Sequence, residues 1–131
     1  MDTQPITTFL TQYVPDLQAL YQFGSQVRGD ARPGSDIDLA VLARNRIPAE
    51  RLFELAQELA VRLGRDVDLL DLRRASTVMR AQVIATGQCL ASTNDQARAE
   101  FEMYAFSDYA RLNEERRELL HDIKARGLIY G

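Results

Sequence analysis

Several residue types that commonly carry chemistry are scarce in this 131-residue chain, which has one cysteine, one histidine and no tryptophan. One cysteine and one histidine are too few for a zinc hydrolase site, and they also exclude a cysteine-nucleophile mechanism. His121 lies among charged residues, so we expect it at the surface. Cys89 has no partner for an internal disulfide, which is typical of a reducing compartment, and we expect it to be a small buried hydrophobic residue.

The chain also lacks a long apolar run and a strong charge of either sign. No stretch of the sequence is long and apolar enough to span a bilayer, and the N-terminus has no basic cluster typical of a signal peptide. These features predict a cytoplasmic protein. The net charge of −3 and the pI of about 5.2 argue against a general nucleic-acid binder. The length and the 46% hydrophobic content predict one domain over residues 1–131.

Hydrophobic spacing predicts an ordered series of helices and strands along the chain. We expect helices over residues 6–13, 48–63, 78–84 and 96–126, and strands over 17–23, 36–42, 66–72 and 88–91. This order predicts an α/β fold with a small mixed sheet of three to four strands, flanked by helices, and a long C-terminal helix. That last helix is too long for so small a sheet to cover. We expect Tyr104 and Tyr109 in the core; the alternative is that these tyrosines, together with Leu120, meet a helical partner.

Two aspartates of the second expected strand, Asp36 and Asp38, are the first candidate site residues. At positions i and i+2 their side chains leave the same face, with Cα atoms about 6.5–7 Å apart. Two carboxylates so placed repel each other unless a cation lies between them, and Mg²⁺ suits such oxygen ligands. A third carboxylate nearby permits a second metal ion. The next strand offers Asp66, Asp68 and Asp71 for this role.

A turn rich in Gly, Ser, Asp and Pro precedes the aspartate pair and follows the first strand. Gly24 lets the backbone approach a phosphate closely, and Ser25 and the following amides can donate hydrogen bonds to it. Arg28 and Arg32 can clamp a triphosphate. A metal and phosphate site without a nucleophilic side chain suits nucleotidyl transfer, which needs orientation and charge neutralisation. The alternative is a solvated loop beside aspartates that face water.

The segment from Phe23 to Leu42 (FGSQVRGDARPGSDIDLAVL) resembles the signature of the polymerase-beta-type nucleotidyltransferases, and most closely that of the minimal nucleotidyltransferases. Residues 66–72 (DVDLLDL) resemble the strand that carries the family's third carboxylate, so the resemblance covers about residues 17–72, which would be the catalytic core. It implies the nucleotidyltransferase fold. The implied ligands of one or two Mg²⁺ ions are Asp36, Asp38 and Asp68, the last chosen because it precedes an apolar pair. The implied ATP-binding residues are Gly24, Ser25, Arg28 and Ser35.

Many minimal nucleotidyltransferases are antitoxins that transfer AMP from ATP to a tyrosine of a helical HEPN-type ribonuclease toxin. The resemblance therefore implies protein adenylylation with release of pyrophosphate, and a hetero-oligomer in which helix 96–126 provides a partner surface. Asp68 is the candidate that takes the acceptor's proton. Two alternatives remain: nucleotidyl transfer to a small molecule such as an aminoglycoside, and a non-catalytic antitoxin that neutralises its toxin by occlusion.

Overall fold

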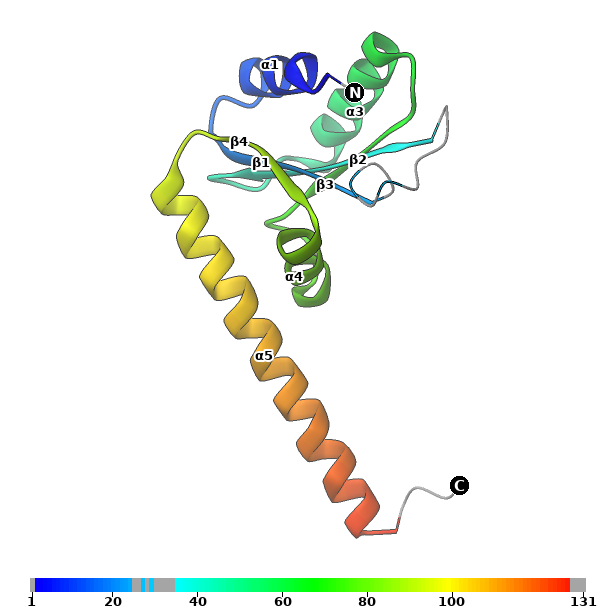
Figure 1. The fold of residues 1–131 in the computed structure, drawn as a ribbon, viewed down its shortest axis with the longest axis vertical. Coiled ribbons are helices and arrows are strands. Elements are labelled where there is room, and N and C mark those ends of the chain that lie inside the picture. The colour runs from blue at the N-terminus through cyan, green and yellow to red at the C-terminus, as the bar shows by residue number, and fades with distance from the viewer. Residues whose placement is uncertain (1, 25–26, 28, 30–34, 128–131) are drawn as a thin grey trace.

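The computed structural model describes residues 2–24, 27, 29 and 35–127, and the expected helices and strands are all present in this part of the chain. The helices are α1 (Gln4–Tyr13), α3 (Ala49–Leu63), α4 (Thr77–Thr86) and α5 (Asp95–Ala125), and the strands are β1 (Leu17–Phe23), β2 (Ile37–Ala43), β3 (Val67–Asp71) and β4 (Gln88–Ser92). Figure 1 shows their arrangement. The predicted turn over residues 24–35 lies largely outside the described residues.

The four strands form one mixed sheet in the order β3-β2-β1-β4. The central strand β1 is antiparallel to both β2 and β4, whereas β2 and β3 are parallel. A parallel pair needs a long crossover connection, and α3 supplies it. This confirms the predicted mixed sheet and places the fourth strand at an edge.

Helices cover the sheet on both faces, with α1 and α3 on one side and α4 on the other (Figure 1). The core between the sheet and the α1/α3 layer includes Ile6, Phe9, Leu10, Leu20, Ile37, Leu39, Val41, Leu55 and Leu59. The core on the opposite face, against α4 and the start of α5, includes Ala19, Tyr21, Ala40, Leu42, Leu72, Val83, Phe101 and Ala105. Alternate residues of β2 thus enter different cores, as the period of a strand requires.

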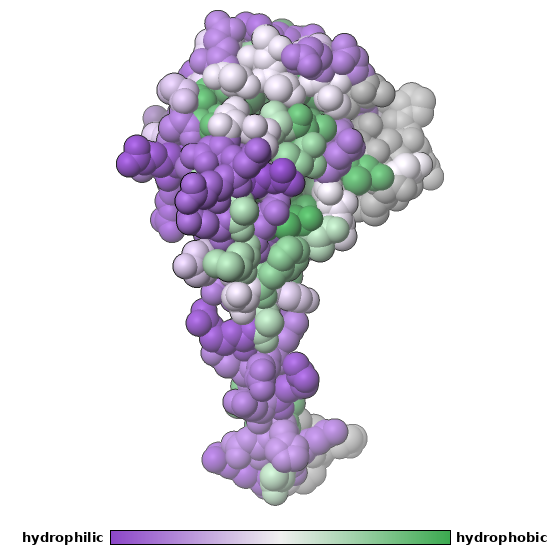
Figure 2. Space-filling model, turned by 60° about the vertical axis from the view of Figure 1, so that its left-hand side comes forward, coloured by the Kyte–Doolittle hydropathy of each residue, from purple (hydrophilic) through white to green (hydrophobic). Residues whose placement is uncertain are grey.

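Helix α5 begins at an Asn94 cap, whose side chain accepts a hydrogen bond from the backbone N–H of Ala97 at 3.0 Å. The helix has 31 residues, which correspond to a length of about 46 Å. Its buried residues are Phe101 and Ala105, close to its start. The rest of the helix projects away from the sheet (Figure 1), and in Figure 2 hydrophilic residues cover most of this projection, with a few apolar ones among them.

Two expectations about burial were wrong. The side chain of Tyr104 is 62% exposed, at the edge of a groove that it lines together with Gln18 of β1 and Arg80 of α4, while Tyr109 is half-buried. Cys89 is half-buried on the edge strand β4, where a second neighbouring strand is missing on one side among the described residues. His121 is exposed near the end of α5, as expected.

Among the described residues, every helix is too short or too polar to cross a lipid bilayer.

Candidate active site

The strand register brings the predicted aspartates to one end of the sheet. Asp38 of β2 and Asp68 of β3 are direct partners across the parallel pair, where neighbouring strands lie about 4.8 Å apart. Asp36 immediately precedes β2, and Asp66 immediately precedes β3. The backbone N–H of Ile37 donates to the carbonyl of Asp66 at 2.9 Å, so the pairing of the two strands extends to their first residues.

The aspartates occupy the part of their face that the helices leave uncovered. Asp38 shares its face of β2 with Ala40 and Leu42, which are fully buried against the α4/α5 layer. Asp38 is half-buried, whereas Asp36 and Asp68 are exposed. The acidic cluster therefore begins where the packed core ends, and its side chains are accessible to a ligand from solvent.

Gly24 lies in contact with this cluster. Phe23, the last residue of β1, pairs with Asp38, so the chain turns at Gly24 directly beside the Asp38 carboxylate. A Cβ atom at Gly24 would lie 2.2 Å from Oδ2 of Asp38, and the backbone φ of Gly24 is +76°. Glycine is needed here both for the left-handed backbone and for the close approach. The sequence predicted that the turn and the aspartates share one site, and the Gly24–Asp38 contact supports this.

The other predicted nucleotide-binding residues are only partly described. Ser25, Arg28 and Arg32 lie outside the described residues. Ser35 is described, and its backbone carbonyl accepts a hydrogen bond from Nη2 of Arg65. Sequence reasoning gave Arg65 no role, although its place between a helix-ending glycine and the third strand was a readable signal.

Asp71, a competitor for the third carboxylate, has a structural role. It is 2% exposed, and its carboxylate accepts hydrogen bonds at 2.9 Å from the backbone N–H groups of Ile47 and Arg73. It also pairs with Arg74 at 3.6 Å. Asp71 ends β3 at the opposite end of the strand from Asp68, so it cannot join the cluster around Asp38.

The donor chemistry of the cluster fits Mg²⁺. Magnesium binds through one or two carboxylates and completes its octahedron with water and substrate phosphates. Among residues 2–24, 27, 29 and 35–127, no three acidic, histidine or cysteine side chains converge as a ready-made ligand cage. The exposed Asp36 and Asp68 carboxylates lack the packing that would fix their rotamers, so rotation about χ1 can turn them toward Asp38. Asp38, in contrast, is half-buried and lies against Gly24.

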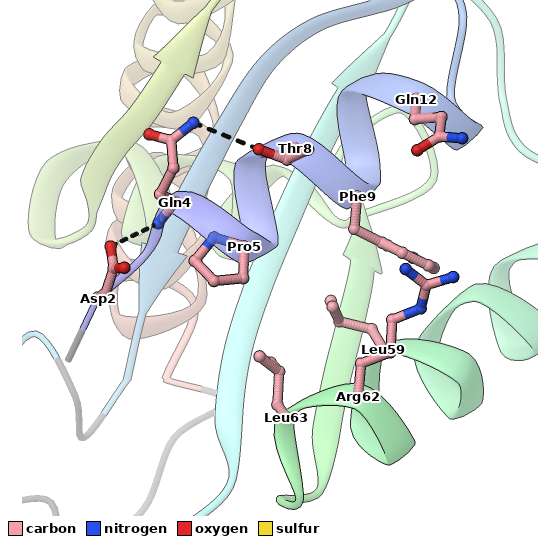
Figure 3. Close-up of a pocket in the computed structure, with 9 residues that line it drawn as sticks. All are labelled: Asp2, Gln4, Pro5, Thr8, Phe9, Gln12, Leu59, Arg62 and Leu63. Carbon is pink, nitrogen blue, oxygen red and sulfur yellow. Dashed lines mark hydrogen bonds between the residues drawn. The ribbon is translucent and has the colours of Figure 1, made fainter.

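An apolar groove between α1 and α3 is separate from this site. Its cavity has a volume of about 400 Å³, and the guanidinium of Arg62 lies over the ring of Phe9, 4.8 Å from the ring centroid (Figure 3). Phe9 and Leu59 belong to the core of the α1/α3 face, on the other side of the sheet from Asp38. The groove therefore contributes no side chain to the acidic cluster.

A mixed sheet with paired carboxylates on neighbouring strands and a glycine turn against one of them is an arrangement that suits phosphoryl or nucleotidyl transfer assisted by a metal ion. The family model described as "Polymerase beta, Nucleotidyltransferase" matches residues 4–96. The chain belongs to this nucleotidyltransferase family.

Two groups of relatives show which members of this family the chain resembles. The chain is 39% identical to the protein adenylyltransferase MntA of Shewanella oneidensis over 125 residues, which are 95% of this chain and 89% of the relative. It is similar to a chain in a crystal structure of a toxin–antitoxin with AMP-PNP, at 40% identity and a TM-score of 0.85, covering 95% of this chain and 99% of that one. It also resembles a chain in the structure of the tri-AMPylated Shewanella oneidensis HEPN toxin in complex with MNT antitoxin, at 39% identity and a TM-score of 0.76, covering 92% and 93%.

Proposed function

We propose that this nucleotidyltransferase transfers AMP from ATP to a tyrosine hydroxyl of a HEPN-type toxin and releases pyrophosphate. The observation that carries the proposal is that Gly24 contacts Asp38, and Asp38 pairs with Asp68, at one end of the sheet. It is supported by relatives of nearly the same length, among them one named as a protein adenylyltransferase and one in complex with an AMPylated toxin.

Asp36, Asp38 and Asp68 would hold one or two Mg²⁺ ions, which supply charge neutralisation to the phosphates of ATP. The backbone at Gly24, with Ser25, Arg28 and Ser35, would bind and orient the triphosphate. The acceptor hydroxyl oxygen attacks the α-phosphorus and forms the new P–O bond. The bond to the bridging oxygen between the α- and β-phosphorus breaks, and pyrophosphate leaves with its electron pair.

Asp68 is the residue proposed to take the acceptor's proton on a carboxylate oxygen. It is exposed, so an incoming hydroxyl can reach it, and it lies directly beside Asp38. General-base transfer of this kind contributes about 10²–10⁴-fold to a rate.

Asparagine variants of the aspartates test the chemistry. We expect Asp36→Asn or Asp38→Asn to reduce AMP transfer to the toxin by at least about 10³-fold, because the metal-binding charge is lost while the shape is kept. Mass spectrometry of the toxin after incubation with ATP and Mg²⁺ measures the product, and circular dichroism checks the fold. EDTA should stop the reaction and added Mg²⁺ should restore it. Wild-type turnover in either variant would remove these aspartates from the mechanism.

The same variants separate catalysis from occlusion. If the Asp36→Asn/Asp38→Asn double variant still neutralised the toxin fully, binding alone would explain the antitoxin activity. Incubation with an aminoglycoside in place of the toxin tests small-molecule transfer, for which we expect no product.

We further propose that residues 1–131 act as one nucleotidyltransferase domain in which the projecting part of α5 is the toxin-binding surface. Leu119 and Leu120 are 59% and 54% exposed on this projection, among charged neighbours. A helix of this kind gains most of its stability from packing, which a helical partner would provide. Leu119→Glu with Leu120→Glu should weaken toxin binding at least about tenfold in calorimetry, a loss of about 1.4 kcal/mol, without lowering the Tm. Unchanged affinity would place the interface elsewhere.

A further inference from the structure

Arg65 joins the starts of the two strands that carry the aspartates. Its Nη2 donates a hydrogen bond to the carbonyl of Ser35, the residue directly before Asp36. Arg65 itself directly precedes Asp66, whose carbonyl accepts the backbone N–H of Ile37 at 2.9 Å. We propose that Arg65 is a positioning residue for nucleotidyl transfer, which fixes Asp36 relative to Asp38 and Asp68. The inference rests on the proposed function of this site.

The anchor of Arg65 is rigid. Its backbone N–H donates to the carbonyl of Ala60 at 3.2 Å, in the capping turn that follows α3. Gly64 forms this turn with a φ of +67°. Helix α3 packs on the sheet through buried residues such as Leu55 and Leu59. Arg65 therefore extends from a turn that directly follows a helix packed on the sheet, and its hydrogen bond to Ser35 links this turn to the backbone before β2.

A tether at this point matters for Asp36 because its side chain is exposed. It is exposed and precedes the first residue of β2, so no core packing restrains its side chain. Asp38, in contrast, lies within the strand and against Gly24. A hydrogen bond from a charged guanidinium to a carbonyl belongs to the stronger class of such bonds. It acts beside the hydrogen bond from Ile37 to Asp66, so two bonds link the starts of β2 and β3.

The position of Asp36 matters because the carboxylates act together. A misplacement of about 1 Å in a catalytic constellation can reduce a rate about 10²-fold. Loss of Arg65 should therefore reduce kcat and the affinity for the divalent cation together. The KM for ATP should change little, because the guanidinium of Arg65 is bound to the backbone carbonyl of Ser35.

The experiment compares Arg65→Met with Arg65→Lys, and uses Arg62→Met as the control. Arg62 is an exposed residue near the end of α3. Its guanidinium lies over Phe9, on the face of the sheet opposite to Asp38. Titration of each protein with Mn²⁺, followed by electron paramagnetic resonance, gives cation affinity without any turnover. Adenylylation of the toxin gives kcat and the KM for ATP, and thermal unfolding gives the Tm.

We expect Arg65→Met to lower kcat by about 30–100-fold and to weaken Mn²⁺ binding at least about fivefold, with the KM for ATP within about threefold of wild type. Arg65→Lys, which keeps one donor and the charge, should recover part of both losses, and Arg62→Met should match wild type. A raised KM with unchanged kcat would make Arg65 a substrate ligand and would overturn the proposal. Unchanged kcat and Mn²⁺ affinity in Arg65→Met would also overturn it.

A folding defect of Arg65→Met and a failure of the proposed function can both be distinguished from a failure of this inference. If Arg65→Met does not unfold cooperatively, Arg65→Lys decides, and wild-type kcat with wild-type Mn²⁺ affinity in that variant would refute the inference. If the wild-type protein adenylylates no toxin, the proposed function fails, whereas the Mn²⁺ titration still tests whether Arg65 organises the acidic cluster.

Discussion

Substitution of Gly24 by alanine tests most directly whether the turn after β1 and the Asp38 carboxylate form one site. The added methyl group would lie 2.2 Å from Oδ2, 3.0 Å from Cγ and 3.3 Å from Cβ of Asp38. The carboxylate oxygen must retreat from 2.2 Å to at least 3.4 Å for ordinary contact, a displacement of about 1.2 Å. Because Asp38 is the central carboxylate of the cluster, its displacement affects every ligand that the cluster binds.

The expected magnitudes follow from this displacement and from the backbone. A shift of about 1 Å in a catalytic group can reduce turnover about 10²-fold, so we expect kcat for AMP transfer to fall by about that factor. An alanine at positive φ costs about 1–2 kcal/mol, which corresponds to a decrease in Tm of roughly 3–10 °C. The variant should therefore remain folded at 25 °C and be almost inactive.

Gly64→Ala provides the matched control. Gly64 has a similar φ of +67°, but a Cβ atom there would meet nothing within 4 Å. Because nothing blocks the added methyl group, the turn before Arg65 should keep its shape, so Gly64→Ala should lose about the same stability as Gly24→Ala and keep most of its turnover. Pyrophosphate release with the toxin as acceptor measures the rates, and differential scanning calorimetry measures the Tm. Wild-type turnover in Gly24→Ala, or an equal loss of turnover in Gly64→Ala, would refute the reasoning.

Three other predictions concern the remaining polar groups of the sheet and its helices. Asp71→Ala should lower the free energy of unfolding in urea by about 2–4 kcal/mol, because the buried N–H group of Ile47 and the partly buried one of Arg73 lose their acceptor; a loss below about 1 kcal/mol would contradict the structural role. Asp66→Asn should retain most of the adenylyl transfer that Asp68→Asn loses, and the opposite order of rates would exchange their roles. Burial, and then the hydrogen bond from its hydroxyl to Glu102 at 2.7 Å, raise the pKa of Tyr21 above its usual 10. The unfolded chain therefore releases this proton first, so the free energy of unfolding should fall above pH 10 by up to about 1.4 kcal/mol per pH unit. Tyr21→Phe should remove that part of the pH dependence, and an identical alkaline slope in both proteins would show that Tyr21 does not cause it.

The start of the long helix α5 packs on the sheet, and its projecting part is the proposed toxin-binding surface. Its first turns pack through Phe101 and Ala105, and Tyr21 of β1 reaches Glu102 on the same helix. Tyr104, which lies between these two buried residues in the sequence, is exposed. Beyond Ala105 the helix leaves the sheet (Figure 1). The first turns of α5 therefore belong to the core on the face of the sheet that carries Asp38, and the projecting part of the helix continues from there.

Much of this protein is determined locally by its sequence. The alternation of Ile37, Leu39 and Val41 with Asp38 and Ala40 sets the strand and its two faces, because the period of a strand is two residues. The helix-ending Gly64 and the Asn94 cap likewise act through their immediate neighbours. Local patterns of this kind were sufficient to predict the helices, the strands and the aspartate pair.

The tertiary structure decided what depends on residues distant in the chain. The pairing of β2 with β3 selects Asp68 as the neighbour of Asp38, while burial turns Asp71 into a structural acceptor, although both aspartates look alike in the sequence. The contact of Gly24 with Asp38 and the hydrogen bond from Arg65 to Ser35 arise only after the strands align. The exposure of Tyr104 likewise follows from how α5 packs, and its position in the sequence does not reveal it. Periodicity describes which face of an element a side chain occupies, but only packing determines which other element, if any, that face meets.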